Sequence, residues 1–182
     1  MNHFKIISGV DSKYIIVVVP PKRSRKKALM KKHNMIICGK PGVGKTRKCI
    51  IEAIELLKKT NNNVAIFHLH NEYAELSKIN PSALILDQQY PNMKSLLGFL
   101  DSIYDAAYKT SATNAYTVFI EDSLSTVVDI LELIRRIKKL NSVNVQLRIV
   151  VEEFNNVAGY SEDSDIYLPW FKENFSEVIL EI

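Results

Sequence analysis

The chain alternates between continuous apolar runs and segments in which apolar residues recur every three or four positions. Strands buried on both faces of a parallel sheet produce continuous runs, whereas a helix lying against a sheet produces the second pattern. The runs predict strands at Met35 to Cys38, Val64 to Leu69, Thr117 to Ile120 and Leu147 to Val151. Strands and helices therefore alternate, which predicts an α/β fold with a doubly wound, mostly parallel sheet.

Two predicted helices each carry one apolar stripe at i, i+3, i+4, i+7 spacing. The stripes are Ile50, Ala53, Ile54 and Leu57 in the first helix, and Val127, Ile130, Leu131 and Ile134 in the second. Another helical pattern surrounds Leu96, Leu100 and Ile103, after a short apolar run at Ala83 to Leu86. Each stripe predicts a helix that packs one face against the sheet.

The two ends of the chain each predict one further strand, at Tyr14 to Val19 and at Glu177 to Ile182. A length of 182 residues suits one α/β domain and is short for two. We therefore expect an N-terminal strand and basic segment over 1–33, followed by one core domain over 34–182.

Composition and charge narrow the functional classes. No apolar run reaches the roughly 18 residues of a membrane span, and no secretory signal is evident, so we expect a soluble cytoplasmic protein, in the host cytoplasm if viral, without a membrane partner. The two cysteines, Cys38 and Cys49, have neither metal-ligand nor disulfide spacing. Residues 22–32 hold seven of the 24 basic residues and no acid. That segment is either a nucleic-acid contact or a solvated loop, and its candidate contacts are Lys22, Arg23, Arg25, Lys26 and Lys27.

The most specific motif follows the strand at Met35 to Cys38 directly. The sequence GKPGVGKT matches the Walker A phosphate-binding loop G-x-x-x-x-G-K-[ST], here between a predicted strand and a predicted helix. Glycines allow the loop amides to point inward around an anionic phosphate chain. The predicted nucleotide-binding residues are Gly39, Lys40, Pro41, Gly42, Val43, Gly44, Lys45, Thr46 and Arg47.

Within this loop, Lys45 is expected to reach the β- and γ-phosphates, and Thr46 to place its hydroxyl on Mg²⁺. Hydrolysis also needs a carboxylate near the metal and a base that orients water. Glu121 and Asp122 end the apolar run of a predicted Walker B strand. Asp122 is predicted to hold Mg²⁺ and Glu121 competes for that role, because successive strand residues face opposite ways. The alternative is that both acids cap a helix starting near Ser125.

Glu72 follows the strand that ends near Leu69 and is the candidate general base, with Glu121 as the alternative. His68 and His70 lie close to it in sequence. No third metal ligand accompanies them, so packing or local hydrogen bonding is the favoured role.

These motifs resemble the RecA/KaiC-like ATPases over about residues 34–182. The resemblance rests on CGKPGVGKT, on VFIEDSLSTV with Ser123 after the aspartate, and on the glutamate after the second strand. It implies that Glu72 is the catalytic base and that Val145 to Glu152, a polar loop through Asp165 and FSEVILEI complete the domain. Glu152 and Glu153 stand where many relatives carry a glutamine or another polar sensor.

The chain also resembles FtsK/HerA-type DNA pumps, including compact viral genome-packaging ATPases. The Glu72–Tyr73 pair after the second strand and the basic helix IRRIKKL carry that likeness. It implies that Arg135 or Arg136 acts as an arginine finger on a neighbouring subunit's nucleotide, whereas the alternative is an ordinary solvated helix face. Pumps of this type usually read Asp-Glu at Walker B, the reverse of Glu121–Asp122.

Two other classes fit less well. Small nucleotide kinases close an arginine-bearing lid over the phosphates, and no arginine follows Arg148. No N-K-x-D motif for guanine is present, so ATP is the expected nucleotide. The sequence therefore predicts a Mg·ATP-hydrolysing, oligomeric ring or filament coupled to nucleic acid, with a low-turnover KaiC-like switch as an alternative.

Overall fold

The computed structural model describes residues 5–6, 15–19, 34–59, 62–68, 73, 76, 84–87, 93–110, 114–121, 129–158 and 164–181. Its strands are β1 (Lys5–Ile6), β2 (Ile15–Val19), β3 (Met35–Cys38), β4 (Asn62–His68), β5 (Leu84–Asp87), β6 (Ala115–Glu121), β7 (Val145–Val151) and β8 (Ser176–Glu181). Its helices are α1 (Lys45–Leu57), α3 (Met93–Lys109), α4 (Ile130–Leu140), the 3₁₀ helix η3 (Phe154–Ala158) and α5 (Ser164–Asn174).

Within the described residues, the strands form one sheet in the order β1-β2-β8-β3-β7-β6-β4-β5. The strands from β8 to β5 in this order run parallel, whereas β1 and β2 pair antiparallel at the β8 edge. The strand predicted at Tyr14 to Val19 is thus observed as β2, an added edge strand of the same sheet.

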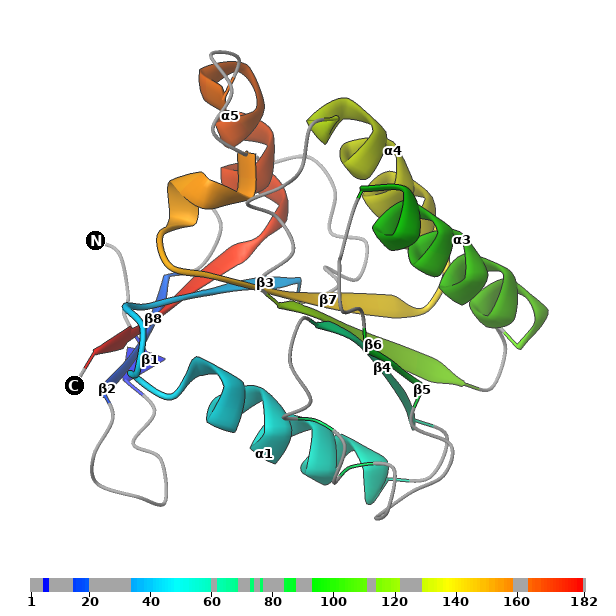
Figure 1. Cartoon of the computed structure of the whole chain (residues 1–182), viewed down its shortest axis with the longest axis horizontal. Helices are drawn as coiled ribbons and strands as arrows, with labels where there is room; N and C mark the ends of the chain where they lie inside the picture. The colour runs from blue at the N-terminus through cyan, green and yellow to red at the C-terminus, as the bar shows by residue number, and fades with distance from the viewer. Residues whose placement is uncertain are drawn as a thin grey trace.

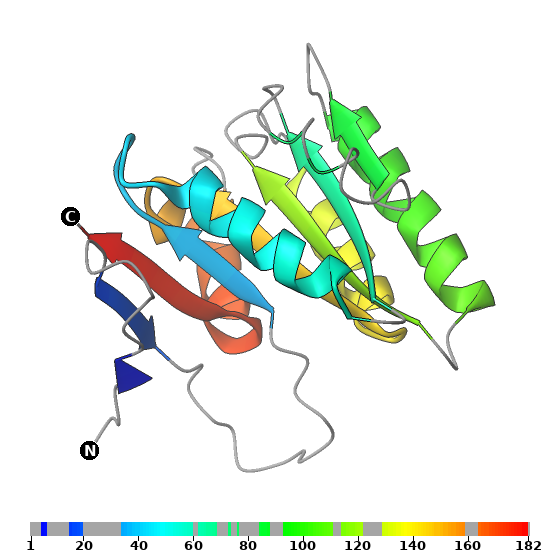
Figure 2. The same cartoon turned by 90° about the horizontal axis from the view of Figure 1, so that it is seen from below.

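Helices cover both faces of the sheet, as Figures 1 and 2 show. The α1 helix crosses one face, while α3, α4 and α5 lie on the other. This separation follows from right-handed crossovers, because the chain moves one way across the sheet through α1 and the opposite way through the later helices. The predicted α/β class, with a mostly parallel sheet and helices on both faces, is confirmed, and the arrangement is consistent with a RecA-like fold.

The core lies in two layers because strand residues alternate between faces. Ile66, Phe119 and Val150 pack with Cys49 and Ala53 of α1 on one face. The other face packs against α3, α4 and α5, and its buried members include Phe67, Ile120, Leu96, Leu100, Ile103, Leu133 and Phe171. The α3 pattern at Leu96, Leu100 and Ile103 is therefore confirmed as a buried stripe.

Two local predictions need correction. Leu131 is 44% exposed and does not belong to the buried stripe of α4. That stripe keeps Ile130 and Ile134 from the prediction and adds Leu133, Ile137 and Leu140. The polar loop predicted through Asp165 leads into α5, which the prediction missed. Pro169 lies inside α5 and reads as a helix breaker, but Leu168, Phe171 and Phe175 recur at helical spacing and are buried.

No helix among the described residues is long and apolar enough to cross a membrane.

Candidate nucleotide-binding site

The loop after β3 lies at a point where the chain path divides. From β3 the chain leaves through α1 toward β4 on one face, and from the neighbouring β7 it leaves through η3 and α5 toward β8 on the other. Connections that diverge from adjacent parallel strands open a crevice at their carboxyl ends, where α/β sheets bind ligands. The Gly39 amide donates a 3.0 Å hydrogen bond to the Glu152 carbonyl, which ties the β3 loop to the end of β7.

The backbone of this loop depends on its glycines. Gly42 and Gly44 have φ of 83° and 87°, in the left-handed region that glycine adopts most readily. A Cβ at Gly39 would lie 2.7 Å from Val43 Cγ2 and 2.9 Å from the Leu180 carbonyl oxygen, so position 39 has no room for a side chain. The motif glycines are therefore required by conformation and by close packing against β8.

The amino end of α1 faces the loop without an acidic residue. Gly44 is the N-cap residue, offers no side-chain cap, and no acid lies in the first turn. The free amides and the positive end of the helix dipole are both favourable to an anion. The local backbone thus has the features of a phosphate-binding loop.

Lys45, the first residue of α1, folds back over the loop. Its Nζ donates to the carbonyl oxygens of Gly39 at 2.6 Å and Lys40 at 3.1 Å. These contacts hold the ammonium group within the loop rather than in bulk solvent. A phosphate oxygen would offer this ammonium group a stronger, charge-assisted partner than a neutral carbonyl.

The next residue, Thr46, connects the loop to the tip of β6. The Thr46 hydroxyl donates to Glu121 Oε1, and Glu121 is only 4% exposed. Glu121 shares the α1 face with Phe119, two residues earlier, as strand alternation requires. This contact spans β7, which separates β3 from β6, and it is possible because α1 crosses beneath that strand.

Tyr73 supplies the second partner of the same carboxylate. Its hydroxyl donates to Glu121 Oε2, and the residue is 1% exposed. The Tyr73 ring meets the His68 ring edge-on at a centroid distance of 4.8 Å. Burial, with the nearby Cys49 and Glu121, raises the pKa of Tyr73 well above its ordinary value, so the phenol keeps its proton and remains a donor.

The two cysteines are buried thiols rather than reactive groups. Burial raises the pKa of Cys38 to about 12 and is also the main cause of the raised pKa of Cys49. Both are free cysteines. They pack in the core beside the loop, in agreement with the absence of disulfide or metal-ligand spacing.

The predicted site residues divide into those that the structure describes and those outside it. Thr46, Lys45 and Glu121 lie together at the carboxyl edge of β3 and β6. Val43 is buried, whereas Lys40, Pro41 and Arg47 are exposed around the loop. Asp122, Glu72, His70 and the basic residues Lys22, Arg23, Arg25, Lys26 and Lys27 lie outside the described residues.

The alternative that Glu121 and Asp122 cap a helix starting near Ser125 falls on residues 122–128, which lie outside the described residues. Helix α4 starts at Ile130, and its N-cap is Asp129, whose side chain accepts a 3.0 Å hydrogen bond from the Glu132 amide. Glu121 instead bonds Thr46 and Tyr73. The position of Glu121 therefore owes nothing to capping α4.

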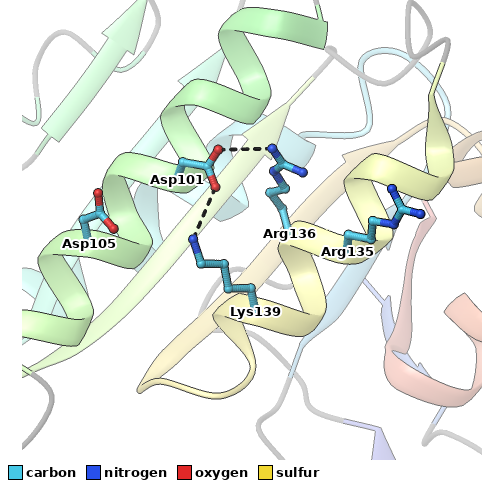
Figure 3. Close-up of a pocket in the computed structure, with 5 residues that line it drawn as sticks. All are labelled: Asp101, Asp105, Arg135, Arg136 and Lys139. Atoms are coloured by element: carbon cyan, nitrogen blue, oxygen red, sulfur yellow. Dashed lines mark hydrogen bonds and ion pairs between the residues drawn. The ribbon is translucent and has the colours of Figure 1, made fainter.

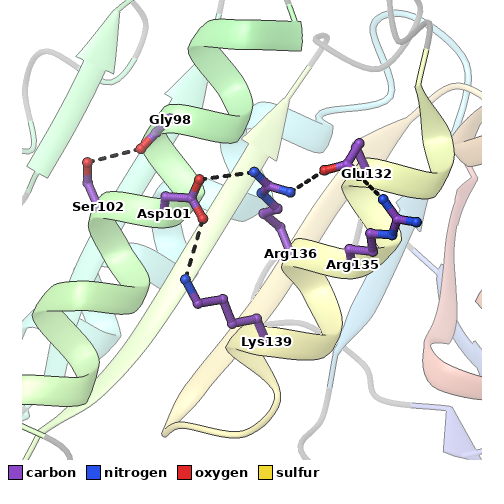
Figure 4. Close-up of polar contacts among 7 residues, drawn as sticks. All are labelled: Gly98, Asp101, Ser102, Glu132, Arg135, Arg136 and Lys139. Atoms are coloured by element: carbon purple, nitrogen blue, oxygen red, sulfur yellow. Dashed lines mark hydrogen bonds and ion pairs between the residues drawn. The ribbon is translucent and has the colours of Figure 1, made fainter.

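Arg135 and Arg136 lie on α4, on the face of the sheet away from α1. Together with Asp101, Asp105 and Lys139 they line an open depression between α3 and α4, shown in Figure 3. Both arginines pair with Glu132, and Asp101 pairs with Arg136 at 3.4 Å and with Lys139 at 3.8 Å, as Figure 4 shows. This depression lies on the face of the sheet opposite α1, and four of its five charged residues have ion-pair partners: Asp101, Arg135, Arg136 and Lys139.

Sequence reasoning missed two contributors to the site. Tyr73 is 48 residues from Glu121 in sequence, and its only signal was its place beside Glu72. Arg148 on β7 is 6% exposed at its side chain and bonds Glu52 on α1 at 2.7 Å, which fixes the helix to the sheet. No local sequence pattern predicts either contact, because each joins segments that are far apart in sequence and meet only in the folded chain.

The oxygen donors at the loop fit Mg²⁺. Thr46 contributes a hydroxyl and Glu121 a carboxylate, both hard oxygen ligands, and Mg²⁺ in nucleotide sites takes few protein ligands beside water and phosphate. Within the described residues, no group of three or more His, Cys, Asp or Glu side chains forms a dedicated metal site. Thr46 and Glu121 are thus the described residues at the loop that could hold a metal ion.

No protein-family model matches the chain, and no curated protein matches it. One solved structure that matches is that of Drosophila ORC bound to DNA, with 18% sequence identity and a TM-score of 0.42. The match covers 66% of this chain and 32% of that chain, so the likeness spans about a third of its length. At this level the match carries no inference about function.

Proposed function

We propose that the chain is a P-loop ATPase that binds Mg·ATP at Gly39 to Thr46 and hydrolyses it. The observation that carries the proposal is the hydrogen bond between Thr46 and Glu121, which joins the phosphate loop to a buried carboxylate at a topological switch point. The loop glycines, the uncapped helix end and the inward Lys45 support the same function.

Each side chain has a distinct role in this proposal. The loop amides and Lys45 bind the β- and γ-phosphates and stabilise the charge that develops during transfer. Thr46 and Glu121 would hold Mg²⁺, which when bound neutralises phosphate charge. A hydroxyl has one proton and two lone pairs, so Thr46 can donate to Glu121 while its oxygen faces the metal. Glu121 therefore takes precedence over Asp122 for the metal side.

The general base is then one of the remaining carboxylates near this edge. Glu72 lies outside the described residues and directly precedes Tyr73, whose hydroxyl bonds Glu121. Asp122 directly follows Glu121 and is the second candidate. A carboxylate in either position would orient the attacking water and accept its proton.

Nucleotide binding by the Lys45→Ala variant is the direct test. Loss of a charge-assisted contact to phosphate should weaken binding of a fluorescent ATP analogue by roughly 100-fold, or about 3 kcal/mol. Lys48→Ala is the matched control, because Lys48 is a lysine one turn further along α1. Wild-type protein that binds no nucleotide, or equal binding by wild type and Lys45→Ala, would exclude the proposal.

Coupling to nucleic acid is a second part of the proposal, supported by the basic segment 22–32. Steady-state ATP hydrolysis would be measured with and without single- and double-stranded DNA at low and moderate salt. Stimulation by DNA that disappears when Lys22, Arg23, Arg25, Lys26 and Lys27 are changed to Ala favours an FtsK/HerA-like or packaging motor. ATP binding without a DNA effect favours a KaiC-like switch with a protein partner.

The assembly state belongs to the same proposal. RecA-like and FtsK-like machines complete their sites at subunit interfaces, and a head-to-tail interface closes into a ring or extends as a filament. Light scattering with and without Mg·ATP measures the molar mass of the assembly and hence its oligomeric state. A monomer under both conditions would remove this part of the proposal while leaving nucleotide binding intact.

A further inference from the structure

Tyr73 lies near the carboxyl ends of β4 and β6, where it places a neutral phenol against a buried carboxylate. Tyr73 and Glu121 are both almost fully buried. Burying a carboxylate is costly unless its oxygens receive hydrogen bonds. Here Tyr73 serves Oε2 while Thr46 serves Oε1. The two donors together fix the rotation of the carboxylate about its last bond.

The ring of Tyr73 is itself held firmly in place. It packs edge-on against His68 at the end of β4, and its hydroxyl also lies against the Cys49 thiol of α1. The register of β4 on β6 pairs Phe67 with Ile120, so His68 and Glu121 follow in the same row at the carboxyl ends. Tyr73 thus joins the ends of two parallel strands to the first turns of the helix that follows the phosphate loop.

We propose that Tyr73 is a positioning residue that aims the Glu121 carboxylate at Thr46 and at the Mg²⁺ of bound nucleotide. This inference rests on the proposed ATPase function of the loop. Tyr73 does not touch phosphate or metal in this scheme. It acts through Glu121, in the way that hydrogen-bond partners behind a metal ligand orient the ligand and tune its affinity.

Loss of the Tyr73 hydroxyl should lower the affinity for Mg²⁺ rather than the affinity for the nucleotide itself. When the Tyr73 hydroxyl is absent, Oε2 loses the hydrogen bond that Tyr73 donates, and the carboxylate is held less firmly toward Thr46. Affinity for Mg²⁺ in the nucleotide complex should then fall by roughly 10- to 100-fold, the usual range for loss of such a partner. Binding of nucleotide without metal depends on the loop amides and Lys45, and it should stay unchanged.

Tyr73→Phe is the variant that isolates the hydroxyl, since it keeps the ring packed on His68. Binding of a fluorescent ATP analogue is titrated at increasing Mg²⁺ and again in excess chelator. Tyr116→Phe is the matched control, because Tyr116 lies at the opposite end of β6 from Glu121 and its hydroxyl pairs with Thr110 Oγ1 at 3.2 Å. We expect the half-saturating Mg²⁺ concentration to rise only in Tyr73→Phe, with metal-free binding equal in all three proteins.

A double-mutant cycle with Glu121→Gln separates positioning from general support of the fold. If Tyr73 acts through Glu121, the effect of Tyr73→Phe on Mg²⁺ affinity should be strongly reduced in the Glu121→Gln background. Independent, multiplying effects would overturn the inference. The effect of Tyr73→Phe is measured once in wild type and once in Glu121→Gln, and the two effects are compared. A general loss of stability would lower Mg²⁺ affinity equally in both backgrounds and would therefore not appear as coupling.

The outcomes also separate this inference from the function on which it rests. Wild-type protein that binds nucleotide only with Mg²⁺-independent affinity, or not at all, would overturn the proposed function and the inference together. Mg²⁺-dependent binding by wild type with an identical Mg²⁺ titration in Tyr73→Phe would overturn the inference alone. Equal loss of metal-free and metal-bound affinity in a folded Tyr73→Phe would also overturn it, because it would indicate damage to the loop itself.

Discussion

The carboxyl edge of the sheet and the outer face of α3 and α4 both gather charged side chains, yet they do so in opposite ways. At the sheet edge, Glu121 is 4% exposed and its donors come from segments far apart in sequence. On the outer face, Glu132 pairs with Arg135 and Arg136 at helical i, i+3 and i, i+4 spacing, and the Arg135 side chain is 62% exposed. The first arrangement is convergent and buried, whereas the second is exposed to solvent and consists of pairs within α4 and from α4 to Asp101 of α3.

This contrast indicates where a ligand site is expected. Burying Glu121 has a desolvation cost that the hydrogen bonds from Thr46 and Tyr73 offset, and buried polar groups with such costs cluster at functional sites. Exposed ion pairs cost little and stabilise little, about 0–1 kcal/mol each. The α3–α4 depression is therefore a poorer guide to function than the hydrogen bonds that join Thr46, Glu121 and Tyr73.

The largest expected effect falls on hydrolysis at the buried edge. Removing the general base should lower turnover by roughly 10²- to 10⁴-fold while ATP stays bound. Glu72→Gln and Asp122→Asn test the two candidates, each isosteric with the native side chain. We expect the large loss in Glu72→Gln, measured as steady-state phosphate release beside equilibrium ATP binding. Normal turnover in Glu72→Gln with a large loss in Asp122→Asn would move the base to Asp122.

The next effect compares a glycine in each region. Gly39→Ala introduces a Cβ against the Leu180 carbonyl and Val43, and overpacking of this kind should cost about 1–3 kcal/mol of unfolding free energy. Gly98→Ala in α3 meets no atom within 4 Å and should stabilise the protein by about 0.5–1 kcal/mol through helix propensity. Urea denaturation of both variants measures the difference. Equal changes in unfolding free energy would mean that the loop backbone accommodates a Cβ at position 39 as easily as α3 does at position 98.

Sequence patterns predicted much of the fold because parallel strands are buried on both faces. A continuous apolar run leaves few alternatives for such strands, so β3 was predicted with its observed bounds and β4, β6, β7 and β8 with shifts of one or two residues at their ends. In the α4 stripe, Ile130 and Ile134 are buried as predicted, whereas Leu131 was wrongly included because it is apolar and satisfies the spacing equally well. Apolar spacing constrains the period of a helix more firmly than its phase.

The candidate site was predictable only in part, for a related reason. The Walker A loop is local in sequence, and its glycines and Lys45 are recognised without tertiary information. That Glu121 lies on the α1 face could not be predicted from the sequence, because it depends on the phase of β6 relative to α1, which the whole sheet sets. Tyr73 required more, since its approach to Glu121 brings together residues 48 apart in sequence. Long-range polar contacts of this kind leave no periodic trace.

The smallest expected effect lies on the outer face and concerns Arg135. Its pairing with Glu132 is exposed, so Arg135→Ala should change the unfolding free energy by less than about 1 kcal/mol and turnover by less than about two-fold. Glu132→Gln is the companion variant, since it weakens the same pair from the other side. A large loss of turnover in Arg135→Ala would contradict this comparison. Restoration by mixing Arg135→Ala with Lys45→Ala would then assign Arg135 to a neighbouring subunit's nucleotide, because only an interface between the two variants combines an intact arginine with an intact phosphate loop.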